Sequence, residues 1–246
     1  MKIRIKFRKY GPIRFIGHLD VMRYFQKAMR RAQIDIAYTS GFSPHQIMSF
    51  AAPLGVGLES NGEYMDIECH SVTSSQDMIQ RLNRVGVTGM EVISVKVLPE
   101  NAGNAMASVA AASYTVRFRE GREPQFDWAN ELQTFFQSQK PIYIMKETKT
   151  GRVEVDIRPG IYEIFVVPQD AGKQPAIHML VDASSAGNLK PGKVMEAFLG
   201  AYKEPLQENA LLITREDVFT NIGTPENPRR IPLDAVGMDI NEVITH

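Results

Sequence analysis

Two histidines in the first fifty residues, His18 and His45, have the side chains best suited to acid–base chemistry. An imidazole gains and loses a proton near pH 7, so it can act as general base or general acid. Beside an RNA backbone, it could activate a ribose 2′-hydroxyl without a metal ion. A lone histidine can equally cap a helix or form a hydrogen bond within a loop. His18 and His45 are therefore catalytic candidates, with structural roles as the alternative.

Positive charge is concentrated in the first 34 residues. This stretch holds ten basic side chains and one acidic one, although the whole chain has 28 of each sign. Clustered cations neutralise phosphates and release counterions, so a basic surface is a candidate RNA interface. Such a surface can also be merely solvated, or can pair with acids elsewhere in the chain. The predicted RNA-binding residues are Arg14, Arg23, Lys27, Arg30, Arg31, Phe42 and His45.

The segment 38–50 supplies the aromatic member of this set. Gly41 and Pro44 predict a loop. This loop would display Phe42 and His45, and an exposed ring can stack on an unpaired base. Phe42 could equally anchor the loop against the core.

Cysteine and glycine patterns exclude several cofactor sites. The single cysteine, Cys69, excludes an intrachain disulfide and any iron–sulfur cluster that needs three or four thiolates of this chain. Cys69 and His70 are adjacent in a predicted strand and point to opposite faces, so they make a poor metal pair. The run GVG at 55–57 is too short for a dinucleotide fingerprint, and no Walker lysine follows it. We predict no cofactor and no metal site.

Periodicity predicts the elements that must position these residues. Apolar residues alternate with cations over 2–8, which is typical of a strand with one buried and one cationic face. Over 18–32 the apolar residues recur at helical spacing, and four cations between Arg23 and Arg31 fall on the opposite side. The order in this half is β-α-β-β-α-β, that of a ferredoxin-like domain. Its other predicted elements are a short strand at 48–52, a strand at 63–70, a helix at 75–85 and a strand at 90–98.

The second half has a similar pattern after a small, polar boundary at 99–108. We predict an α+β protein with two tandem ferredoxin-like domains, 1–98 and 109–219, the second with an extra hairpin. Prolines and weak periodicity predict that 220–246 is an extended or mobile tail. The predicted elements are strands at 114–118, 142–147, 153–157, 161–167, 177–182 and 211–219, helices at 126–138 and 191–202, and hairpin turns at 149–151 and 170–172.

The N-terminus alternates charged and apolar residues, so it lacks the apolar core of a signal peptide. No apolar run approaches the ~20 residues that a membrane span requires. A single cysteine is typical of proteins from reducing compartments. We therefore expect a cytoplasmic protein with no membrane partner.

Several separated motifs resemble one known family. In chain order they are similar to the radical-SAM-linked protein family, a domain of unknown function, over about residues 1–215. Members of that family stand beside, or are fused to, a radical SAM protein, often near genes for an E/G-type ribonuclease and ribosomal proteins. The resemblance thus implies a radical SAM partner and a setting near RNA, and it supplies no catalytic residue. The motifs are IRFIGHLD at 13–20, GFSPHQIMSF at 41–50, GEYMD at 62–66, AAASY at 110–114 and EVDIRP at 154–159.

We predict an accessory module, more probably non-enzymatic by itself, that binds RNA or a ribosomal particle and works with a partner radical SAM protein. With one cysteine, this chain cannot hold the cluster of a radical SAM enzyme. Two alternatives stay open. One is a metal-independent endoribonuclease that uses His18 or His45. The other is a protein-interaction module with no RNA ligand, whose cationic face docks an acidic partner.

Overall fold

Strands and helices alternate along the chain, which is a mixed α+β protein. The computed structural model describes residues 1–138, 140–148, 151–168 and 175–244. Within them there are six α-helices, and the strand pairing is mostly antiparallel. The chain divides into unit 1, Met1–Ala110 with Asp217–His246, and unit 2, Ala111–Glu216. Of the predicted hairpin turns, 149–150 and 170–172 lie outside the described residues.

The sheet of unit 1 is built around β1 (Lys2–Lys9). β1 pairs antiparallel with β3 (Glu59–Glu68) on one side and with β4 (Met90–Val97) on the other. The short strand β2 (Met48–Phe50) pairs antiparallel with β3. The order is therefore β4-β1-β3-β2, so strands that are consecutive in the chain are separated in the sheet.

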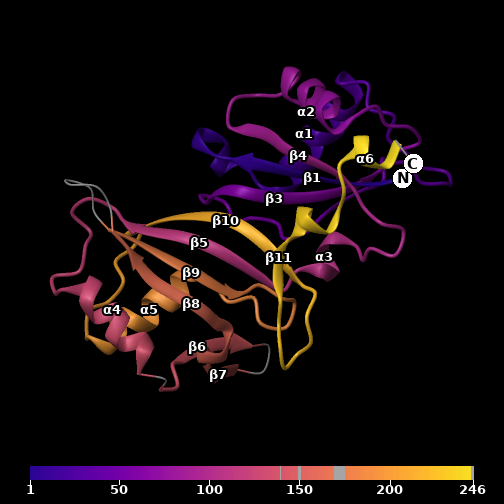
Figure 1. Ribbon diagram of the computed structural model, residues 1–246. Helices are drawn as coiled ribbons and strands as arrows, with labels where there is room; N and C mark the ends of the chain where they lie inside the picture. The colour runs from indigo at the N-terminus through magenta and orange to yellow at the C-terminus, as the bar shows by residue number, and fades with distance from the viewer. Residues whose placement is uncertain (139, 149–150, 169–174, 245–246) are drawn as a thin grey trace. The chain divides into compact units, whose positions relative to one another are not determined.

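Two helices cover one face of this sheet, α1 (His18–Arg31) and α2 (Ser75–Arg84) (Figure 1). The alternation in β1 sends Ile3, Ile5 and Phe7 to this face, where burial of apolar side chains stabilises the fold. The core between sheet and helices includes Ile3, Ile5, Phe7, Val21, Phe25, Met29, Met65, Ile67, Met78 and Leu82.

The C-terminal segment belongs to unit 1, in contrast to the predicted extended or mobile tail. Its prolines end short elements, and it packs because Leu233 and Ile240 are completely buried. β11 pairs with the end of β10, and Ile240 joins the core of unit 1. The elements concerned are β10 (Leu211–Asn221), β11 (Arg230–Pro232), the 3₁₀ helix η3 (Leu233–Val236) and α6 (Ile240–Ile244).

Unit 2 has an antiparallel sheet of its own, in which β5 (Ala111–Phe118) pairs with β9 (Ala176–Asp182) and β9 pairs with β8 (Ile161–Val167). Helices α4 (Trp128–Gln137) and α5 (Pro191–Ala201) lie on one face of it (Figure 1). The core of this unit contains the fully buried Leu132, Val194 and Phe198.

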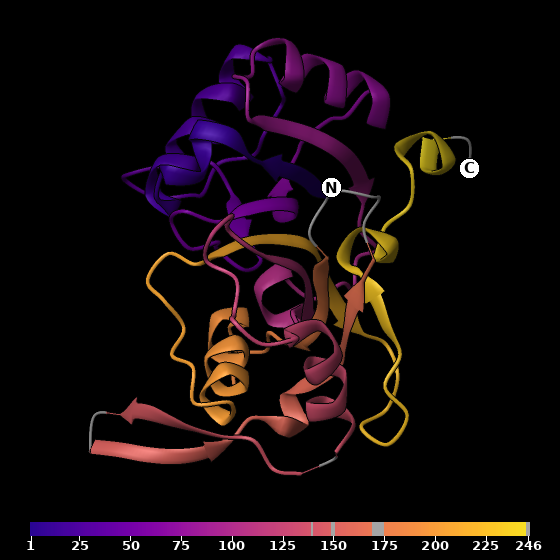
Figure 2. The same ribbon diagram turned by 90° about the vertical axis from the view of Figure 1, so that its left-hand side faces the viewer.

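The remaining elements are short. β6 (Tyr143–Thr148) and β7 (Gly151–Asp156) form a separate two-stranded sheet that projects from the helices of unit 2 (Figure 2). The segment predicted as a polar boundary contains a short helix, α3 (Ala105–Ser108). None of the helices in the described ranges is both long enough and apolar enough to cross a bilayer.

Candidate nucleic-acid interface

The exposed side of α1 carries four cations. The opposite side is fixed because Val21, Phe25 and Met29 are buried in the core of unit 1. No ion pair is found for Lys27 or Arg30 in the part of the chain that the structure describes. The helix therefore presents a row of positive charge to solvent. Its members are Arg23, Lys27, Arg30 and Arg31, which we call the α1 cations.

Arg23 differs from the other α1 cations because it has a partner on the same helix. Its Nη1 lies 3.3 Å from Oδ1 of Asp20, and both side chains are more than 60% exposed. An exposed pair of this kind contributes at most about 0.5 kcal/mol and is weakened by salt. A phosphate could therefore displace Asp20 from Arg23 at little cost.

The cationic face predicted for β1 is not exposed, and this prediction is corrected. Arg4 is only 1% exposed, and its Nε and Nη2 lie 2.8 and 2.9 Å from the two carboxylate oxygens of Asp66. Its Nη1 donates to the carbonyl of Leu233 at 2.9 Å. Lys6 Nζ lies 2.7 Å from Oδ2 of Asp217. These cations neutralise carboxylates inside unit 1, so they cannot also hold phosphates.

Tyr64 joins the same polar group. Its hydroxyl donates to Oδ1 of Asp217 at 2.6 Å and lies 3.1 Å from Oδ1 of Asp234. Burial, followed by the two carboxylates, raises the pKa of the Tyr64 hydroxyl, so it remains a hydrogen-bond donor. Lys6, Tyr64, Asp217 and Asp234 thus hold the C-terminal segment on the sheet. Sequence reasoning missed this group because its members are more than 150 residues apart.

Arg14, a predicted RNA-binding residue, is also committed to the protein. It lies in the 3₁₀ helix η1 (Gly11–Phe15), directly before α1. Its Nη1 is 3.0 Å from Oε1 of Glu59, which also accepts a hydrogen bond from the backbone N–H of Gly11. The guanidinium stacks on the ring of Phe15, 4.9 Å from the centroid. Arg14 therefore holds η1 against β3.

His18 begins α1 and packs against the core. Its ring meets the ring of Phe50 edge to face, with centroids 5.0 Å apart. The cavity beside it measures about 10 Å³ and is also lined by Lys9 and Glu63. That volume is at the lower limit for a single water molecule. No substrate fits there, so the surroundings of His18 indicate a packing role.

His45 and Phe42 lie in a loop that is closed by a bridge between Tyr38 and Gln46. His45 Nδ1 is 3.1 Å from Oγ1 of Thr39, and the His45 backbone N–H donates to the same oxygen. Phe42 is fully exposed at the loop, so it does not anchor it to the core. Among the residues described, no hydrogen bond, ion pair or ring contact joins this loop to His18 or to the α1 cations.

Cys69 is buried, and burial raises the pKa of its thiol to about 11. It is thus a protonated, packed thiol at neutral pH. In the described part of the chain, no group of three or more histidine, cysteine, aspartate or glutamate side chains is placed to hold a metal ion.

Unit 2, in which sequence reasoning placed no site residue, contains the largest cavity described. It measures about 780 Å³ and lies between the β6–β7 hairpin and the start of α5. Ile144, Val155 and Leu189 contribute apolar wall, and Lys146 and Lys190 contribute positive charge. Since these residues come from separate hairpin and loop segments, no local sequence pattern could have revealed the cavity.

Comparison with known proteins gives one match. A family model described as an uncharacterised protein conserved in bacteria, DUF2344, matches residues 2–191. This range includes η1, α1, the loop with Phe42 and His45, and most of unit 2. No curated protein matches the chain. The description of the family names no activity, ligand or partner.

Proposed function

We propose that this chain, which belongs to the DUF2344 family, is an accessory module that binds RNA through the exposed side of α1. The observation that carries the proposal is a contrast between two sets of cations in unit 1. Those of β1 and η1 are bound to carboxylates, whereas Lys27 and Arg30 on α1 have no ion pair within the described ranges. Exposed cations along one helix face are suited to the regularly spaced phosphates of RNA.

Phe42 supports single-stranded rather than double-stranded RNA. A fully exposed aromatic ring can stack on a base only where that base is unpaired. In this proposal the α1 cations hold phosphates, Phe42 stacks on a base, and His45 orients a base or ribose. Arg14 is left out because Glu59 and Phe15 already hold its guanidinium.

The strand order supports ferredoxin-like domains. In unit 1 the chain order β1-α1-β2-β3-α2-β4 is combined with the sheet order β4-β1-β3-β2. Unit 2 has β5-α4-β8-β9-α5-β10, with β6 and β7 inserted, and the pairing β5-β9-β8. Related RNA-binding modules stack bases on the open face of the sheet. In unit 1 the C-terminal segment contacts Arg4 and Tyr64 on that face, which favours the helix side for RNA.

A protein partner is favoured by exposed apolar residues at the start of α1. Phe15, Leu19 and Val56 are each about 60% exposed. The N–H of Gly57 donates to the carbonyl of Arg14, which brings Val56 beside η1. On the resemblance of 13–20 and 41–50 to the radical-SAM-linked family, we propose that the partner is a cytoplasmic radical SAM protein. Its iron–sulfur cluster must come from that partner, because this chain has one cysteine.

The test is RNA binding across a salt series. Purified wild-type protein is titrated with a labelled unstructured RNA, and the double variant Lys27→Glu/Arg30→Glu is compared with it. Loss of two phosphate contacts should flatten the slope of log K against log salt by about 1.4. The matched control is Arg84→Glu/Arg117→Glu, which makes the same change in net charge at exposed positions on α2 and β5.

Three results would contradict the proposal. They are no binding of RNA at low salt, equal binding by the α1 variant and the wild type, and equal loss in the α1 variant and the control. Incubation of the RNA with protein in chelator tests the endoribonuclease alternative at the same time. Cleavage that disappears in His18→Ala or His45→Ala would replace an accessory role by a catalytic one.

A further inference from the structure

The outer edge of β8 has no strand beside it. β8 pairs with β9 on one side, and among the described residues no strand pairs with its other side. Its sequence is IYEIFVV, with one charged residue and no proline. Proteins usually protect an edge strand with lysine, proline or a covering element, because its free N–H and C=O groups can pair with another strand. A shift in register between Ile161 and Glu163 is the one such feature in β8.

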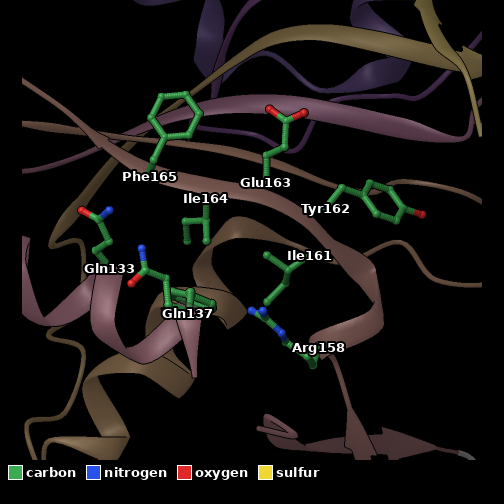
Figure 3. A pocket seen from close by; sticks show the side chains of 9 residues that line it. Gln133, Gln137, Arg158, Ile161, Tyr162, Glu163, Ile164 and Phe165 are labelled. Carbon is green, nitrogen blue, oxygen red and sulfur yellow. The ribbon is translucent and has the colours of Figure 1, made fainter. Parts of the chain in front are cut away.

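A groove of about 330 Å³ runs beside this edge, between β8 and α4 (Figure 3). Residues 161–165 of β8 form one wall, and Gln133, Phe136 and Gln137 of α4 form the other. Figure 3 shows Ile161 and Ile164 on the side of β8 that faces α4. The volume is at the low end for a ligand pocket, and it suits one or two side chains of an extended segment.

Polar side chains at the groove have no partner within the described part of the chain. This is the case for the exposed side-chain amides of Gln133 and Gln137 and for the guanidinium of Arg158. Arg158 begins the 3₁₀ helix η2 (Arg158–Gly160), at the start of β8. Its backbone N–H donates to Asp156 at 2.9 Å, which fixes its position. A free guanidinium is suited to a carboxylate, and side-chain amides are suited to a peptide backbone.

We propose that this groove binds an extended acidic segment of a partner protein, which adds a strand to β8 and places a carboxylate on Arg158. Backbone hydrogen bonds along β8 supply affinity in this mode of recognition, and side-chain contacts supply specificity. A second copy of this chain does not satisfy the groove by pairing β8 with β8. The one acid of β8, Glu163, points away from α4 (Figure 3), so it would not meet Arg158. The proposal is independent of RNA binding by α1.

A phage-displayed library of random short peptides, selected on the full chain, is the probe. We expect enriched peptides to combine β-branched or aromatic residues with a glutamate or aspartate. Each is then synthesised with a fluorescent label and titrated by anisotropy. Arg158→Glu should weaken binding at least about tenfold, the loss of one charge-assisted hydrogen bond. The control Arg152→Glu, at an exposed position on β7 that pairs with Glu147, should bind as the wild type does.

Methylation of single peptide nitrogens tests the added strand directly. Since only alternate N–H groups of an added strand face β8, methylation should weaken binding at alternate positions and leave the others unchanged. The variant Lys27→Glu/Arg30→Glu should retain peptide binding, which separates this result from that of the RNA proposal.

Four outcomes would overturn the proposal. They are a selection that enriches no peptide, equal binding by Arg158→Glu and Arg152→Glu, an effect of methylation without alternation, and a dimer in light scattering that Glu163→Pro converts to a monomer. The last result would assign the edge of β8 to a second copy of the chain.

Discussion

Arg4 and Arg23 carry the same guanidinium in opposite environments. Arg4 is buried and neutralises Asp66, whereas Arg23 is exposed beside Asp20. Replacing Arg4 by alanine leaves a carboxylate unpaired at a largely buried site, which costs about 3–5 kcal/mol. Replacing Arg23 by alanine should change the free energy of unfolding by less than about 0.5 kcal/mol. Urea denaturation of the two variants measures both values, and similar costs would contradict the ion-pair assignments.

Cys69 gives a pH dependence with a defined sign. Burial raises the pKa of its thiol from the ordinary value of 9.0 to about 11. The stability that the buried neutral thiol contributes is complete below pH 9, where both states are protonated. Between pH 9 and about 11 the unfolded thiol ionises first, so this contribution falls, by at most about 1.4 kcal/mol per pH unit.

The comparison variant is Cys69→Ala, which keeps every tyrosine and lysine that titrates in the same range. The difference in free energy of unfolding between wild type and Cys69→Ala should narrow as pH rises from 9 to 11. Parallel curves for the two proteins would show that the thiol does not titrate as its burial requires.

At the scale of elements, helix α2 depends on its first turn. Ser74 is the N-cap, and its Oγ accepts a hydrogen bond from the backbone N–H of Asp77. The hydroxyl of Thr73 donates to the Asp77 carboxylate, and this bond, followed by Arg81, lowers the pKa of Asp77. An acid in the first turn also favours the helix dipole.

Removal of this cap has a predictable cost. Ser74→Ala should lower the free energy of unfolding by about 1 kcal/mol, because the N–H of Asp77 loses its acceptor. Ser74→Asp supplies an equivalent acceptor and should restore wild-type stability. Thermal and urea unfolding of the pair test this, and an equal loss in both variants would point to packing of Ser74 rather than to capping.

Local patterns located the elements well, and long-range pairing escaped them. The spacing of Val21, Phe25 and Met29 placed α1 over 18–32, and the structure has His18–Arg31. The alternation in β1 was also correct, but its polar face was misassigned as an exposed RNA surface. The partners of Arg4 and Lys6 include residues more than 200 positions away. No periodicity within 2–8 contains that information.

The candidate site follows the same rule. Amphipathicity identified the α1 cations because a helix face is a local property. Whether His18 and His45 meet depends on how separate elements pack, and the structure surrounds them with different residues, Phe50 and Thr39. The edge of β8 and the groove with Arg158 depend on strand order, which the sequence does not state.

For the whole molecule, unit 1 is made from both ends of the chain. The segment from Asp217 onward supplies Leu233, Asp234 and Ile240 to its interior. A chain that ends at residue 221 loses these groups and leaves Arg4 without the carbonyl of Leu233. We expect it to be destabilised by at least about 3 kcal/mol. A chain that ends at residue 241 keeps all three residues, so its urea midpoint should stay near the wild-type value.

The hydrogen bond from Arg4 to the carbonyl of Leu233 joins residues 229 positions apart. On a translating ribosome the strand that carries Arg4 emerges early, whereas its acceptor emerges only after all of unit 2. Unit 2 has its own core and is continuous in the chain, so it can fold while unit 1 is still incomplete. Until then, the buried cations of β1 lack part of their final set of partners. The nascent protein therefore completes first the unit that its own gene encodes second.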